Sequence, residues 1–128
     1  MAFGDAYQKY LRSKEWFSKR QERMEIDDWE CAICSKHNCA LHCHHLTYDR
    51  LFDENVETDL IMLCKRCHFY MDKIRKQIKR IRIATNDHCP KLDKLLFLYS
   101  YPYGMKKDSR IHLRRLHKYL KKLEGDLK

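Results

Sequence analysis

Two Cys-x-x-Cys pairs constrain the fold of this sequence more than any other feature, Cys31-Ala-Ile-Cys34 and Cys64-Lys-Arg-Cys67. Two thiolate pairs at this spacing can surround one tetrahedral Zn²⁺ ion. A structural zinc site would join two distant segments and would stabilise a chain of only 128 residues, whose hydrophobic core is modest. A redox-active Cys-x-x-Cys pair is the alternative, and Cys39 or His37 would replace a ligand under a different pairing.

The charge of the chain predicts a polyanionic partner. Lys and Arg number 27 against 18 Asp and Glu, which gives a formal net charge of +9 and a pI near 9.2. This balance favours nucleic acid over a membrane surface. The sequence shows no apolar signal segment and no apolar run of membrane-spanning length, so we expect an intracellular, cytoplasmic protein. Its seven cysteines are then expected to be thiols and metal ligands rather than disulfides.

The periodicity of the apolar residues predicts an α+β chain. We expect helices over residues 5–11, 14–24, 68–83, 92–99 and 110–123, strands over 40–46 and 59–63, a polar loop over 47–58 and a turn over 101–104. Ser13 is placed to cap the second helix. We expect one domain over residues 1–84 and a basic helical extension over 85–128, packed on or next to it. The leucines of the last helix would dock it on the core, or this helix would bind DNA or a protein partner.

Histidines gather on the first predicted strand and after the second cysteine pair. His44 and His45 are adjacent, His68 follows Cys67, and Asp72 lies four residues further on. An imidazole serves as metal ligand or as general base near neutral pH, and side chains four residues apart share one face of a helix. Alternation along a strand places His44 and His45 on opposite faces, so they address one cleft only if the strand ends or twists there.

These residues resemble the small HNH endonucleases of the ββα-metal type. The shared pattern is His-His on one strand, Asn or Asp before Leu, and Leu-Cys-x-x-Cys-His leading into a helix, and the resembling segment runs from Tyr7 to Asp72. The resemblance implies a small ββα-metal (HNH) core that a structural zinc staples together. The N-terminal helices and the basic C-terminal extension would flank this core.

The same resemblance implies a role for each residue of the pattern. His45 would be the general base, and His44 and His68 would hold one divalent catalytic ion, Mg²⁺, Mn²⁺, Ni²⁺ or Zn²⁺. Asp59 occupies the position of the Asn for which the N in HNH stands. There it would hold the loop in place and help to orient the imidazole of His45 by hydrogen bonding. Asp72 stands where some members carry a further His ligand.

Two positions depart from the family pattern, Asp59 in place of Asn and Phe52 where many relatives have Gly. The resemblance implies hydrolysis of phosphodiester bonds in DNA, with 5′-phosphate and 3′-hydroxyl products. The alternative is a catalytically inactive zinc module that serves as a nucleic-acid-binding or protein-binding accessory or inhibitor, because a fold does not guarantee an activity.

Basic residues follow the predicted metal ligands along the long helix. We expect them to contact phosphates of the substrate, and a solvated helix face is the alternative. They are Arg75, Lys76, Lys79, Arg80 and Arg82.

Overall fold

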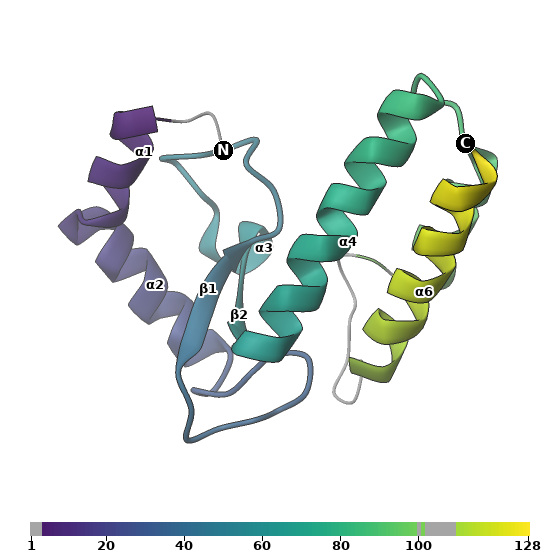
Figure 1. Cartoon of the computed structure of the whole chain (residues 1–128). Coiled ribbons are helices and arrows are strands. Elements are labelled where there is room, and N and C mark those ends of the chain that lie inside the picture. The colour runs from purple at the N-terminus through teal and green to yellow at the C-terminus, as the bar shows by residue number, and fades with distance from the viewer. Residues whose placement is uncertain (1–3, 100, 102–109) are drawn as a thin grey trace.

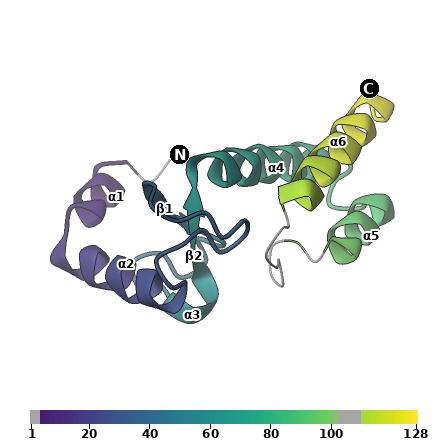
Figure 2. The same ribbon diagram turned by 90° about the horizontal axis from the view of Figure 1, so that it is seen from below.

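A computed structural model describes residues 4–99, 101 and 110–128, and it has the expected α+β composition. Figure 1 shows a two-stranded sheet between the N-terminal helix pair and a long helix, with the last helix alongside that long helix. Figure 2 gives the same order from below and shows α5 beyond α4. The elements are α1 (Gly4–Leu11), α2 (Lys14–Ile26), β1 (Leu41–His45), α3 (Val56–Asp59), β2 (Leu60–Cys64), α4 (Lys65–Ala84), α5 (Pro90–Leu98) and α6 (Arg110–Asp126).

The two N-terminal helices form as predicted, and α2 runs two residues further, to Ile26. The Ser13 hydroxyl accepts a hydrogen bond from the Trp16 N–H at 3.1 Å, so the predicted cap is confirmed. Asp27 follows α2, and its carboxylate accepts a hydrogen bond from the Met62 N–H at 2.9 Å. The end of α2 is thereby fixed to β2.

β1 and β2 pair in antiparallel register, with His44 opposite Ile61 and His45 opposite Leu60. The predicted second strand begins one residue too early, since Asp59 ends the short helix α3. This helix forms within the predicted loop because the Asn55 side chain accepts from the Glu57 N–H at 3.0 Å.

Phe52, which stands where many HNH endonucleases have Gly, adopts a backbone conformation that favours glycine. Phe52 has a φ of 77°, in the left-handed region that a side chain disfavours. Its ring packs edge to face on Tyr10 at 5.0 Å, and its carbonyl accepts a hydrogen bond from the Lys19 ammonium at 3.0 Å. These contacts hold a backbone conformation that Gly would adopt without strain.

The long helix α4 begins at Lys65, three residues before the predicted start. Cys64 is its N-cap, with an extended backbone, so Cys67 lies in the first turn. The predicted helix over 92–99 begins earlier, at Pro90, because proline suits the first position of a helix. Of the predicted turn over 101–104, residues 102–104 lie outside the described residues.

The leucines of α6 form a buried stripe that packs against α4. The sequence left three alternatives for this helix, and the structure shows the first, docking on the core. Each fully buried leucine contributes about 1.5–3 kcal/mol relative to an exposed one, so the stripe stabilises the contact strongly. The buried residues are Leu113, Leu116, Leu120 and Leu123 on α6, and Ile74, Ile78 and Ile81 on α4. In the described part of the chain, no helix has both the length and the apolar character that crossing a bilayer requires.

Candidate functional site

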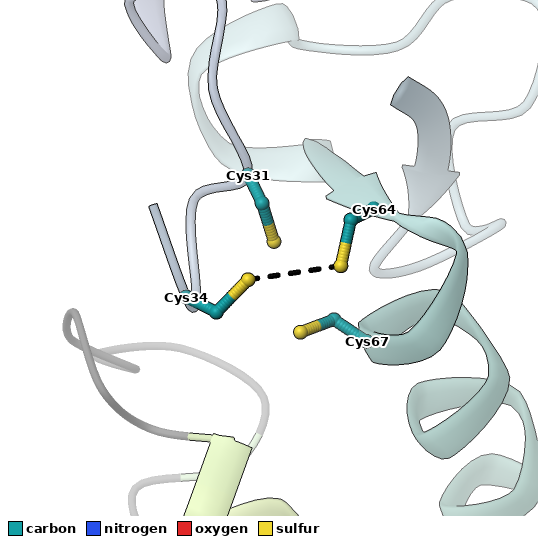
Figure 3. A group of neighbouring side chains, drawn as sticks. All are labelled: Cys31, Cys34, Cys64 and Cys67. Atoms are coloured by element: carbon teal, nitrogen blue, oxygen red, sulfur yellow. Dashed lines mark hydrogen bonds between the residues drawn. The ribbon is translucent and has the colours of Figure 1, made fainter. Parts of the chain in front are cut away.

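Four cysteines form one cluster, as the spacing of the two pairs predicts. Their sulfur atoms all lie within 4.8 Å of one another. Figure 3 shows Cys31 and Cys34 on the loop after α2, Cys64 at the end of β2 and Cys67 in the first turn of α4, with the side chains pointing toward a common centre. A tetrahedron with Zn–S bonds of about 2.3 Å has edges of about 3.8 Å. The Sγ atoms of Cys34 and Cys64 are 3.7 Å apart, so this cysteine cluster fits a metal such as zinc.

Local hydrogen bonds build the loop that carries the first pair. The Ser35 N–H donates to the Cys31 carbonyl, and the Ala32 N–H donates to the Met62 carbonyl of β2, both at 2.9 Å. Ser35 has a φ of 65°, which turns the chain sharply around the cluster. The hydrogen bond from the Cys67 thiol lowers the pKa of Cys31 to about 4, which favours the thiolate that binds metals.

Arg110, the first residue of α6, contacts the cysteine cluster. Its Nη2 atom donates to the sulfur of Cys34 at 3.0 Å and to that of Cys64 at 3.4 Å. Four thiolates around one Zn²⁺ ion carry a net charge of about −2, so a guanidinium there is stabilising. Sequence reasoning placed Arg110 only on the basic face of the last helix, because nothing in its spacing points to the distant cysteines.

We expect Arg110→Met to accelerate the loss of zinc from the cluster. A hydrogen bond to a charged group contributes about 1.5–3 kcal/mol, which corresponds to roughly a tenfold or greater change in the release rate. Transfer of zinc to a chromophoric chelator measures this rate. Arg114→Met is the matched control, because Arg114 is exposed on the same helix. Equal release from both variants would show that the guanidinium does not stabilise the bound metal.

His44, His68 and Asp72 form a second group, here called the His–Asp group. One ligand atom from each lies within 4.8 Å of the others. His44 Nδ1 is 3.7 Å from Asp72 Oδ1, and His68 Nε2 is 3.5 Å from Asp72 Oδ2. Ligand bonds of about 2.1 Å give tetrahedral edges of about 3.4 Å, so these separations suit a small cation. The ring of His42 stacks on that of His68 at 5.3 Å, outside the group.

His44 is held neutral, which is the form that binds a metal. Burial, and next the charge of Arg75, lower the pKa of His44 to about 2. Arg75 Nη2 donates to His44 Nε2 at 2.9 Å and also to the His45 carbonyl oxygen. The guanidinium lies 5.1 Å from the centre of the Tyr48 ring, a cation–π contact. Arg75 therefore lies directly beside the His–Asp group.

His45 lies on the other face of β1, as strand alternation requires. Its ring is stacked between Trp16, at 5.0 Å and 8°, and Tyr48, at 4.8 Å and 20°. Its Nε2 atom is 2.8 Å from Glu54 Oε2. Because a carboxylate only accepts, Nε2 carries the ring proton and Nδ1 keeps a free lone pair. Burial lowers the pKa of His45, and the hydrogen bond to Glu54 partly opposes that shift.

Glu54 is a residue of the candidate site that sequence reasoning missed. Its side chain is buried, and it accepts hydrogen bonds from the Tyr10 hydroxyl at 2.5 Å and the Lys19 ammonium at 2.9 Å. Burial raises the pKa of Glu54, but these hydrogen bonds and that from His45 outweigh burial and lower it below the usual value. The carboxylate is therefore ionised and fixes the orientation of His45. Nothing in its spacing distinguishes Glu54 from the neighbouring acidic residues of the loop.

Asp59 ties the loop, but it does not contact the imidazole in the way the resemblance implies. It is fully buried, and its carboxylate accepts from the Arg50 guanidinium, from the Asn55 N–H at 2.9 Å and from the Thr58 hydroxyl at 3.0 Å. The hydrogen bond from Arg50 contributes most to lowering the pKa of Asp59 to about 2. The carboxylate that orients His45 is Glu54, and not Asp59 as the resemblance implied.

His44 and His45 open on one cleft of about 750 Å³. They point to opposite faces of β1, but the strand ends at His45, so the cleft extends around its end. The remaining members of the His–Asp group line the same cleft. The cationic lining residues are Arg20, Arg75, Lys76 and Lys79.

The predicted phosphate contacts do not share one face of α4. Arg75 and Lys79 line the cleft, and Lys79 and Arg82 continue along the same side of the helix. We call Arg75, Lys79 and Arg82 the basic row. Arg80 instead faces α6, where its guanidinium makes two hydrogen bonds with the Glu124 carboxylate, at 3.0 and 2.9 Å. A cation that is already paired is a weaker candidate for a phosphate.

Comparisons of the chain with protein-family models, with curated proteins and with solved structures found no match. The function is therefore argued from the residues themselves. The basic cleft holds His45 with the ionised Glu54 carboxylate at its Nε2 atom, and the His–Asp group lies beside this pair.

Proposed function

We propose that the protein is a metal-dependent endonuclease of the HNH type, which hydrolyses phosphodiester bonds in DNA. The observation that carries the proposal is the arrangement of His45 and the His–Asp group on one basic cleft. A general base beside a bound metal ion is one arrangement that catalyses phosphodiester hydrolysis. In this proposal, β1, β2 and α4 form the ββα-metal core, and a zinc ion in the cysteine cluster stabilises this core by joining the loop after α2 to β2 and α4.

His45 would remove the proton from the attacking water. Its Nδ1 atom accepts the proton, and the Glu54 carboxylate at Nε2 stabilises the imidazolium that results. Tyr48 and Trp16 fix the plane of the ring through stacking. A divalent ion on His44, His68 and Asp72 would polarise the scissile phosphate and stabilise the departing oxygen.

Arg75 would contact the substrate phosphate once His44 acts as a ligand. A neutral imidazole carries one N–H, so His44 cannot accept from Arg75 at Nε2 and present an unprotonated Nδ1 at the same time. The ligating form carries its proton on Nε2. Arg75 then loses this acceptor but keeps the His45 carbonyl, and the N–H released from His44 can donate to a phosphate oxygen, which a guanidinium matches in geometry.

A plasmid-cleavage assay with added Mg²⁺, Mn²⁺, Ni²⁺ or Zn²⁺ tests the proposal. We expect nicked or linear products with 5′-phosphate ends, which a labelling assay identifies. Protein that cuts neither single-stranded nor double-stranded DNA or RNA with any of these metals, yet binds nucleic acid or a protein tightly, would be an accessory module and not a nuclease.

The basic row gives a prediction about salt dependence. Replacing Lys79 and Arg82 with alanine should weaken binding to all DNA sequences and reduce the salt slope of affinity by about 2, roughly 1 for each lost phosphate contact. Arg80→Ala is the matched control, because Arg80 is paired with Glu124, and it should leave the slope near the wild-type value. Fluorescence anisotropy at several salt concentrations measures both. An unchanged slope in the double variant would place the phosphate contacts elsewhere on the protein.

A further inference from the structure

A second cavity lies beside the cleft, between α4 and α5, with a volume of about 720 Å³. Arg75 and Lys79 line both spaces, so the cavity continues from the cleft along the basic row. Arg82 lies three residues after Lys79 on the same side of α4, and Asn86, in the turn beyond the end of this helix, also lines the cavity. A substrate strand that leaves the His–Asp group along α4 therefore passes the mouth of this cavity.

Cationic and apolar side chains make up most of the lining of the cavity. The basic row provides three cations, and the apolar wall consists of Leu46, Ile78, Ile83, Leu96 and Tyr101. Asn86 and Asp87 complete the lining, so the three cations outnumber its one carboxylate. Ile83 is 72% exposed, so most of its side chain is accessible to a ligand in the cavity. A phosphate alone would make no favourable contact with the apolar wall, and an uncharged apolar ligand would make no ion pair with the cations. A nucleotide matches both, with its phosphate on the basic row and its base on the wall.

The size of the cavity also suits this ligand. Pockets for small ligands have volumes of about 300–1,000 Å³, so 720 Å³ accommodates a nucleotide with its sugar. Asn86 lies at the far end of the lining and offers amide donor and acceptor groups for the edge of a base.

We propose that this cavity binds an unstacked nucleotide of the substrate strand, one that neighbours the phosphate to be cut. The proposal rests on the nuclease function and names its substrate class, a nucleic acid with an unpaired nucleotide at that position. A base inside a duplex is stacked on its neighbours and must leave the stack to enter a walled cavity. A single-stranded tail enters without that cost, so tailed substrates bind more tightly than blunt duplexes.

The test measures binding without added divalent ions, so that affinity is separated from cleavage. Fluorescence anisotropy compares a blunt DNA duplex with the same duplex carrying a single-stranded tail. We expect the tailed duplex to bind about tenfold more tightly, the range for one base on an aromatic and apolar surface. Ile83→Glu should abolish this preference, because it places an anion at the wall of the cavity. Its exposure means that the substitution leaves the packed core intact.

Phe97→Glu is the matched control. Phe97 is 86% exposed on α5 and does not line the cavity, so this substitution introduces the same negative charge outside the cavity. It should reduce affinity for both duplexes equally and keep the preference for the tail. A second readout is 2-aminopurine in the tail, whose fluorescence should change on binding to wild-type protein and much less on binding to Ile83→Glu.

The outcomes separate this proposal from the function on which it rests. Equal affinity for both duplexes, or equal effects of Ile83→Glu and Phe97→Glu, would overturn the cavity proposal and leave the nuclease intact. Binding of free AMP in the cavity with no preference for a tail would also overturn it. A preference that depends on Ile83, in a protein that cuts no nucleic acid, would support the cavity and reject the nuclease.

Discussion

His45→Gln should reduce the rate of DNA cleavage by roughly 10² to 10⁴-fold, the range for a lost general base. The reason is that an amide cannot take the proton from water, whereas it can still donate a hydrogen bond to Glu54. Glutamine is preferable to alanine here, because His45 is only 3% exposed and alanine would leave a cavity between Trp16 and Tyr48. Single-turnover cleavage measures the rate.

Three measurements show whether this loss is catalytic. Zinc content and DNA affinity should stay near the wild-type values, because His45 belongs neither to the cysteine cluster nor to the His–Asp group. His68→Ala should behave differently and lose the catalytic ion, detected as weaker Mn²⁺ binding. Equal cleavage by wild type and His45→Gln would mean that another group is the base or that a contaminating nuclease cuts the DNA.

Glu54→Gln tests the residue that positions His45. It keeps the shape of the side chain but removes the charge that stabilises the imidazolium, so we expect the rate to fall by roughly tenfold or more. Residues that act as one unit are strongly non-additive. In a His45→Gln background, Glu54→Gln should therefore have little further effect on the rate. Additive losses would assign Glu54 to general stability and not to the base.

Most members of the two groups of candidate metal ligands were predictable, because their spacing in the sequence brings them together. Each Cys-x-x-Cys pair points its thiols to one side of a turn, and His68 and Asp72 share one face of α4 by helix periodicity. His44 joins them from β1, and its placement followed from the resemblance and not from periodicity. The structure brings all of these residues into the expected groups.

The surroundings of His45 were not predictable in the same way. Glu54 reaches the imidazole because Lys19 and Tyr10, far away in the sequence, hold its carboxylate in place. Such a contact depends on how α1 and α2 pack over the loop, and no local pattern encodes it. Arg80 is a weaker candidate for a phosphate contact for a similar reason, since its partner Glu124 comes from the last helix.

The second large effect concerns the cysteine cluster, which joins the loop after α2, β2, α4 and, through Arg110, α6. A structural zinc contributes an apparent binding free energy of about 10–16 kcal/mol, comparable with the whole stability of a small domain, about 5–15 kcal/mol. Cys31→Ser and Cys67→Ser should therefore lose zinc and cooperative folding together. Elemental analysis and thermal unfolding followed by circular dichroism measure the two properties.

Cys89→Ser is the matched control, because Cys89 is a free cysteine outside the cluster at the N-cap of α5, where serine is well tolerated. It should keep one zinc ion per chain and a wild-type melting temperature. Mild chelation should act at the other site, since two imidazoles and one carboxylate bind an ion less firmly than four thiolates. Cleavage should then stop reversibly while the fold persists. Wild-type protein purified without chelators and found to contain no zinc would overturn the structural assignment of the cluster.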